Sequence, residues 1–211
     1  MRIGLALVAL WVWPAIAAPI DAAAIQTYDK ALWSQTVTRC DQLAAHRDDP
    51  DRVAPGLERP AMNLDRAIKA CAAALKKDPN HPRLNYQMAR VNGYAGQHAA
   101  GEPFRVKAVM AGYPQALFVV GFIQVTGWSG NPKDVCGGAE LVRRSGLAGR
   151  LAGQVGFPHW LLNGAFKGCP VRQDKAEMAA MLAAAKPQAR DFYERILIEN
   201  LEAQLAAWTP S

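Results

Sequence analysis

Short helical stretches separated by glycine and proline residues are the feature that most constrains how this 211-residue chain can fold. One helix is predicted over Leu64–Lys77, with Asn63 as its N-cap and Pro79 as its stop. A second is predicted over Asp191–Trp208, where the apolar residues form one stripe. That stripe consists of Phe192, Ile196, Leu197, Leu201, Leu205 and Trp208. No stretch alternates apolar and polar residues with a period of two between turns, so we expect an all-α fold.

The chain begins with the pattern of a secretory signal peptide. Arg2 precedes the apolar stretch Ile3–Trp13, and the small residues of Ala15–Ala17 fit the cleavage rule. We expect residues 1–17 to be removed, which makes Ala18 the mature N-terminus and the protein periplasmic or secreted. The alternative is an uncleaved anchor, but the apolar stretch is short for a bilayer span and is followed by a proline. No later segment has the ~18 uncharged apolar residues of a membrane helix, so we expect no membrane span after cleavage.

The next segment, residues 18–63, is predicted to hold one helix and one irregular loop. Apolar residues recur at roughly helical spacing over Ile25–Ala45, which predicts a helix there. Arg47–Asn63 contains three prolines and a glycine among charged residues. This composition excludes regular structure and indicates a connector on the surface.

Four cysteines in an exported chain predict two disulfides, because the compartment is oxidising. Three pairings are possible. We favour Cys40 with Cys71 and Cys136 with Cys169, since each closes a loop of about one helical-repeat length. The competing interpretation is metal binding, but the chain has no C-x-x-C motif and its four histidines lie at no ligand spacing. We therefore expect neither a metal nor a cofactor.

The charge balance favours an anionic partner over nucleic acid. The chain carries 24 Lys and Arg against 18 Asp and Glu, a net charge of +6, and the signal segment removes only one of these cations. The longest basic runs are the pairs Lys76–Lys77 and Arg143–Arg144, and the tryptophans do not alternate with arginines as in a single-strand groove. We expect a protein partner in the cell envelope, which the positive charge allows to be anionic, and no nucleic acid.

Small residues recur at the spacing of a helical repeat. Ala67, Ala74 and Pro79 stand where a tetratricopeptide unit has two packing residues and the terminal proline of its second helix. Gly101 and Ala108 take the small positions of the following unit. Small residues are needed there because the two helices of a unit approach closely. The pattern predicts helical repeats over residues 64–187 and a capping helix over residues 188–211.

Several segments resemble a known family. They are Cys40–Ala45, Asp49–Gly56, Ala70–Cys71, Pro82–Arg90, Ala111–Ala116, Val120–Gly121 and Ser145–Gly156. These segments are similar to exported bacterial proteins of the tetratricopeptide and Sel-like repeat group. The chain departs from the family's motif at Arg150, where the motif usually has a small residue. The resemblance implies a short right-handed solenoid of antiparallel helix pairs.

The same resemblance suggests a ligand groove. First helices of such repeats line the inner surface, so Arg83, Tyr86, Arg90 and Tyr94 would project from one helix face toward a ligand. Two guanidinium groups and two phenols can hold a carboxylate or phosphate. In the alternative, the tyrosines pack between units while the arginines cap carbonyls or stay solvated.

A second candidate for a binding site is the glycine-rich loop with Trp128, Asn131, Lys133 and Asp134, although burial of Trp128 in the core is the stronger expectation. No catalytic residues are predicted, since Gly127–Gly130 is one residue short of a nucleophile elbow and no phosphate-binding glycine motif occurs. We predict a non-catalytic binding or adaptor protein that mediates protein–protein or cell-envelope ligand interactions. The alternatives are an enzyme or accessory factor of cell-wall metabolism, and a structural partner that docks through its C-terminal helix.

Overall fold

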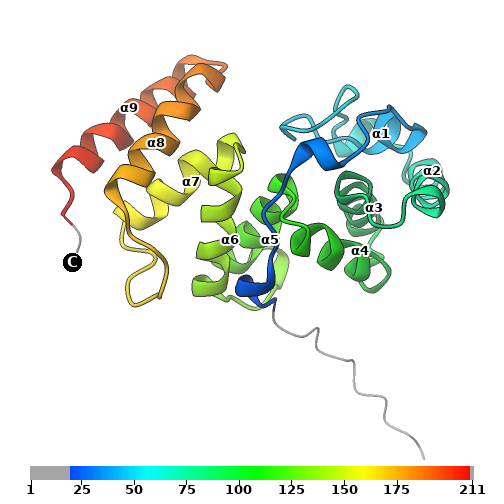
Figure 1. Ribbon diagram of the computed structural model, residues 1–211, viewed down its shortest axis with the longest axis horizontal. Coiled ribbons are helices and arrows are strands. Elements are labelled where there is room, and N and C mark those ends of the chain that lie inside the picture. Colours follow the sequence, from blue (N-terminus) through cyan, green and yellow to red (C-terminus); the bar gives the residue numbers. More distant parts are fainter. Residues whose placement is uncertain (1–19, 210–211) are drawn as a thin grey trace, which may run out of the picture.

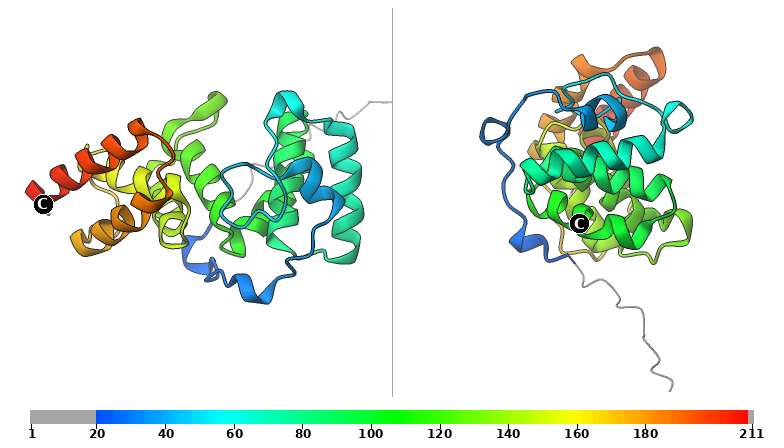
Figure 2. Two further views of the ribbon diagram at one scale, coloured as in Figure 1. Left: turned by 90° about the horizontal axis from the view of Figure 1, so that it is seen from above. Right: turned by 90° about the vertical axis from the view of Figure 1, so that its right-hand side faces the viewer.

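The computed structural model describes residues 20–209, and every regular element in that range is helical, which confirms the predicted all-α class. The signal segment predicted at residues 1–17 lies outside the described residues. The molecule is elongated, with α2 at one end and α9 at the other (Figures 1 and 2). The α-helices are α1 (Arg39–Ala44), α2 (Leu64–Lys77), α3 (Pro82–Tyr94), α4 (His98–Met110), α5 (Pro114–Thr126), α6 (Val135–Leu147), α7 (Leu151–Leu162), α8 (Lys175–Ala185) and α9 (Phe192–Ala207).

Among these described helices, none is by itself long and apolar enough to cross a bilayer. Helices α4 and α5 reach that length and hydropathy only when taken together, across a bend of 116°.

The helix boundaries follow local chemistry. Helix α2 has the predicted bounds, and the Asn63 side chain caps it by accepting a hydrogen bond from the Arg66 N–H at 3.0 Å. Helices α3 and α5 begin at Pro82 and Pro114, a position where the missing N–H of proline costs nothing. The turn before α5 contains Gly112 with φ of 70°, a left-handed conformation that glycine adopts without steric cost.

Consecutive helices pack closely where glycines face each other. A Cβ atom at Gly121 of α5 would stand 2.9 Å from the carbonyl oxygen of Gly138 in α6, and a Cβ at Gly138 would stand 2.8 Å from the Gly121 oxygen. Helices α6 and α7 meet in the same way at Gly146 and Gly153. These four positions lack side chains because helix backbones occupy the space.

Two disulfides join elements that are distant along the chain. Cys40–Cys71 links α1 to α2, and Cys136–Cys169 links α6 to the segment that follows α7. Both predicted pairings are confirmed. Disulfides persist in oxidising compartments, so the pair indicates an environment outside the cytoplasm.

The helix predicted over Ile25–Ala45 is wrong for most of its length, because only α1 and one short 3₁₀ turn, Lys30–Leu32, form there. Residues 20–38 instead run as an extended strap past α5 (Figure 1). The Gln26 N–H donates to the Met110 carbonyl at 2.9 Å, and Arg144 donates to the Ile25 carbonyl at 3.1 Å. These long-range hydrogen bonds replace the helical ones, while the buried Ile25 side chain joins the core around α5.

The segment that follows α1 is irregular apart from the 3₁₀ turn Arg59–Ala61, and it lies on the surface, as predicted, with a few residues buried. We call residues 46–58 the acidic loop, since it carries Asp48, Asp49, Asp51 and Glu58. Asp49 has no exposed surface and Asp51 is only 8% exposed. Polar side chains of α3 and of the N-cap residues before α5 and α7 hydrogen-bond or pair with the inner groups of the loop. Its other side remains exposed, at Arg47, Pro50, Arg52, Pro55 and Glu58.

Helix α9 confirms the C-terminal helix, with Asp191 as its N-cap, but the predicted single stripe divides into two faces. Ile198, Leu201 and Leu205 are buried against α7 and α8. Phe192, Ile196 and Leu197 are exposed instead. A 16-residue helix at the end of the molecule has neighbours on one side only, so it buries only part of its apolar surface.

Candidate binding site

The structure places the predicted row of α3 inside the protein. Arg83 is 1% exposed, and its Nε donates to the carboxylate of the fully buried Asp41 at 2.8 Å. Its terminal nitrogens donate to the carbonyls of Ser34 at 3.2 Å and Thr36 at 3.4 Å. The guanidinium therefore binds the chain's own N-terminal strap and α1.

The other three residues of the row have similar partners. Arg90 donates to the carbonyls of Ala44, Ala45 and Leu57 at 3.0, 2.8 and 2.7 Å, respectively. Tyr86 is buried with its ring 5.8 Å from that of Tyr113, while the partly exposed Tyr94 stacks under the Arg90 guanidinium at 5.1 Å. This corrects the expectation that the row projects into an open groove. A ligand would reach Arg83, Tyr86 or Arg90 only if the segment from Ser34 to Leu57 moved away.

The glycine-rich loop that contains Trp128, the second predicted binding site, also differs from the prediction. Trp128 is 61% exposed, so the expected burial of this side chain is wrong. Asn131 donates to the Trp128 carbonyl at 2.7 Å, and Asp134 caps α6 by accepting from the Gly137 N–H at 2.9 Å. The side chains of Asn131 and Asp134 thus stabilise the loop and the start of α6.

Asp49 links the acidic loop to α5. Its carboxylate accepts from the Tyr113 hydroxyl at 2.7 Å and from the Asp51 N–H at 3.0 Å. Burial raises the pKa of Asp49 to about 6, although the hydrogen bond from Tyr113 works in the opposite direction. This carboxyl is wholly enclosed, so it acts on the fold and does not touch a ligand.

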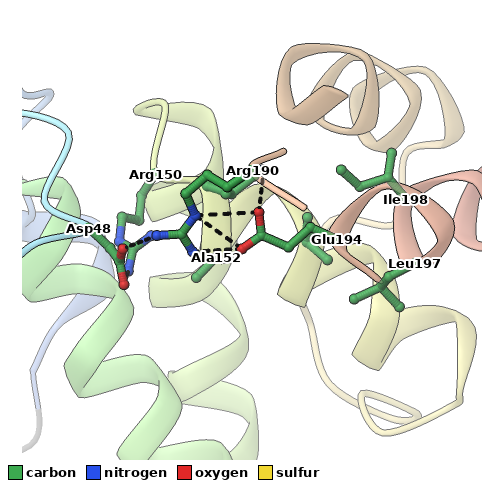
Figure 3. A pocket seen from close by; sticks show the side chains of 9 residues that line it. Asp48, Arg150, Ala152, Arg190, Glu194, Leu197 and Ile198 are labelled. Carbon is green, nitrogen blue, oxygen red and sulfur yellow. Dashed lines mark hydrogen bonds and ion pairs between the residues drawn. The ribbon is translucent and has the colours of Figure 1, made fainter. Parts of the chain in front are cut away.

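A cavity of about 190 Å³ lies where the acidic loop, the first turns of α7 and the start of α9 meet (Figure 3). We call it the loop–α9 cavity. Its charged groups belong to Asp48, Arg150, Arg190 and Glu194. Its remaining walls are the apolar side chains of Leu151, Ala152, Val155, Leu197 and Ile198.

Arg190 lies between the two carboxylates of the cavity (Figure 3). It donates to Asp48 at 2.5 Å and to Glu194 at 2.6 Å. Partial burial raises the pKa of Asp48, but the hydrogen bond from Arg190 and the nearby charge of Arg150 outweigh it and hold that pKa below its usual range. The hydrogen bonds from Arg190 likewise lower the pKa of Glu194. Both carboxylates are therefore anionic near neutral pH.

Arg150 is the buried cation of the cavity. It is 6% exposed, its Nε donates to the Gln115 side chain, and its guanidinium lies 5.3 Å from the centre of the Phe118 ring. The nearest carboxylate oxygen, on Asp48, stands 3.9 Å from its Nη2, which is too far for a hydrogen bond. Burial lowers the pKa of Arg150. Arg150 therefore forms a long ion pair with Asp48, and its terminal nitrogens are not among the buried side-chain atoms of residues 20–209 that lack a hydrogen-bond partner.

The sequence prediction missed Arg150, Arg190 and Asp48. Arg150 carried a signal, since it stands where the repeat motif usually has a small residue. Arg190 and Asp48 carried none, because 142 residues separate them along the chain.

Comparison with family models, with curated proteins and with solved structures gives no match for this chain. The resemblance to tetratricopeptide and Sel-like repeat proteins therefore stays a prediction. In residues 20–209, no group of three histidine, cysteine, aspartate or glutamate side chains is placed to hold a metal ion.

Proposed function

We propose that this is an exported, non-catalytic binding or adaptor protein, active in the periplasm or outside the cell. In this proposal, residues 64–187 form a right-handed tetratricopeptide- or Sel-like solenoid, and α9 closes its C-terminal end. The packing of consecutive helices through facing glycines supports the architecture. The two disulfides support the compartment.

The observation that carries the binding function is the exposed face of α9. Eight large hydrophobic side chains are exposed in the described chain, and four of them gather on the first half of this helix. They are Phe192 (61% exposed), Tyr193 (81%), Ile196 (46%) and Leu197 (41%). A contiguous apolar patch of this kind typically marks an interaction surface. Two of the four are aromatic, and aromatic residues are enriched at the centres of protein interfaces.

We propose a protein partner because the face is helical and adjoins charged groups. Arg195 and Glu199 are exposed on the same helix, where they would form part of a polar rim around the apolar side chains. Such a rim contributes mainly to specificity and association rate, whereas the aromatic and aliphatic side chains supply most of the binding energy.

Affinity capture from the exporting cell tests this proposal with two matched variants. Ile196→Glu places a charge in the α9 face, while Leu32→Glu places one on a side chain that is 74% exposed in the N-terminal strap. We expect Ile196→Glu to lose the partner recovered with the wild type, and Leu32→Glu to retain it, with equal melting temperatures for both. Equal recovery with both variants would refute a role for the α9 face.

A further inference from the structure

The two disulfides of this protein differ in how far solvent reaches them. Cys40 and Cys71 are both completely buried, where α1 packs on α2. Cys136 is exposed at the second position of α6, and its partner Cys169 is half-buried in the segment that joins α7 to α8. The four cysteines of the chain thus form one sealed cross-link and one that solvent reaches.

The surroundings of the second disulfide leave room for another molecule. Gly168 precedes Cys169, and a Cβ atom built on this glycine would meet no atom within 4 Å beyond its chain neighbours. The space beside Cys169 is therefore open. By contrast, Cys40 and Cys71 both belong to a hydrophobic cluster that encloses their sulfur atoms between α1, α2 and α3.

An accessible disulfide reacts with thiols by exchange. A thiolate attacks one sulfur, a mixed disulfide forms, and the other sulfur leaves. Cys136 is the more exposed of the pair, whereas Cys169 packs against the hydrophobic cluster built mainly by α6 to α9. We propose that Cys136–Cys169 is a thiol–disulfide exchange site for a dithiol, which attacks Cys136 and releases Cys169.

The exchange balances with the dithiol as the reductant. Its first sulfur forms a bond to Cys136 while the bond to Cys169 breaks, and Cys169 takes up a proton. Its second sulfur then attacks the first, which releases Cys136 as a thiol. The dithiol ends as a disulfide and has given two electrons to the protein.

Opening this cross-link frees a short segment and leaves the helices in place. Before the disulfide, Phe166 is 1% exposed and its ring stacks on Phe157 at 5.8 Å. After it, the Glu177 carboxylate of α8 accepts hydrogen bonds from Arg143 of α6 at 2.6 and 2.7 Å. These contacts do not involve the disulfide, so its redox state controls the order of residues 167–173 and not the docking of α6, α7 and α8.

Differential alkylation of the folded, fully oxidised protein tests the exchange site. The protein is treated with reduced glutathione at neutral pH, quenched with N-ethylmaleimide and mapped by mass spectrometry. With a monothiol the mixed disulfide is the first product, so we expect glutathione on Cys136 and N-ethylmaleimide on Cys169. Both should be modified at least about tenfold faster than Cys40 and Cys71, which react only when the fold around them opens.

Denaturing urea is the control, because unfolding removes the difference in burial and both disulfides should then open at similar rates. Equal rates for the two disulfides in the folded protein, or no opening of Cys136–Cys169 without urea, would overturn the proposal. Glutathione on Cys169 with N-ethylmaleimide on Cys136 would overturn the choice of the attacked sulfur.

Two single variants compare the sulfur atoms one at a time. Cys169→Ser leaves the thiol of Cys136 alone, and Cys136→Ser leaves that of Cys169. We expect a thiol-reactive chromogenic disulfide to react faster with the Cys136 thiol than with the Cys169 thiol. Equal rates, or the reverse order, would contradict attack at Cys136.

Hydrogen exchange followed by mass spectrometry tests the structural consequence. After dithiothreitol has opened Cys136–Cys169 alone, exchange should rise in residues 167–173 and stay unchanged in α6, α7 and α8. A rise throughout these helices, or none in residues 167–173, would show that the disulfide does not control this segment. The site is separate from the α9 face, so Ile196→Glu should react with glutathione at the wild-type rate.

Discussion

Replacing Arg83 by methionine should strongly destabilise the fold, although sequence reasoning placed this residue in a ligand groove. The change keeps most of the side-chain volume but leaves the fully buried Asp41 without its cation. Breaking a buried ion pair in this way costs about 3 to 5 kcal/mol. Asp41 still accepts hydrogen bonds from Thr38 and Gln87, so the lower end of that range applies. For a chain of this size, a loss of about 3 kcal/mol should lower the melting temperature by roughly 6 to 12 °C.

Urea denaturation at neutral pH with both disulfides intact measures this cost directly. Arg66→Met is the matched control, since Arg66 is exposed on α2, and it should leave stability almost unchanged. Adding Asp41→Asn to Arg83→Met removes the stranded charge and keeps an acceptor for Thr38 and Gln87, so the double variant should be more stable than Arg83→Met alone. A loss below about 1 kcal/mol for Arg83→Met, or no recovery in the double variant, would refute the reasoning.

Three further predictions concern pH, packing and cross-links. The pKa of Asp49 is about 6 in the folded protein against 3.8 for an unperturbed side chain, so the protonated form stabilises the fold below pH ~4 and this contribution is lost as the pH rises through 6. Asp49→Asn should therefore raise the free energy of unfolding at pH 7.5 by up to about 3 kcal/mol, with little gain at pH 4. Thermal melting at the two pH values checks this, and an equal gain at both would contradict a raised pKa for Asp49. Gly138→Ala should cost about 1 to 3 kcal/mol because its Cβ meets the Gly121 backbone. By contrast, Gly93→Ala in α3, where no atom lies within 4 Å of the new Cβ, should gain about 0.5 to 1 kcal/mol, and urea denaturation of the pair gives the comparison. Replacing Cys136 and Cys169 by serine should lower the free energy of unfolding by about 3 to 4 kcal/mol, the chain-entropy value for a loop of 33 residues. Urea denaturation measures this, and a loss near zero would show that the disulfide does not constrain the unfolded chain.

The sequence predicted best those elements whose signals are local. Helix α2 needed only Asn63 as a cap and the residues around Pro79 as a stop, and α9 needed only its apolar spacing and Asp191. The disulfide pairing followed from loop lengths. By comparison, the helix predicted over Ile25–Ala45 failed because the apolar residues in its middle have no core to face. Leu32 is 74% exposed and Val37 is 48% exposed.

The candidate site depended on contacts that no local pattern encodes. The spacing of Arg83, Tyr86, Arg90 and Tyr94 correctly put four side chains in a row, and both arginines do bind oxygen acceptors. The sequence could not tell that these acceptors come from the chain itself, since the partners lie 33 to 49 residues away. Burial of Asp49 and Asp51 in the acidic loop was missed for the same reason, because proline and charge usually indicate exposure.

Site-specific photo-crosslinking in the exporting cell tests the proposed binding function most directly. A photoreactive phenylalanine derivative replaces Tyr193 on the α9 face in one variant and Leu32 in the N-terminal strap in the other, two side chains of similarly high exposure. We expect a discrete crosslinked protein band at Tyr193, identifiable by mass spectrometry, and none at Leu32. Absence of any specific product at Tyr193, or the same products at both positions, would contradict it.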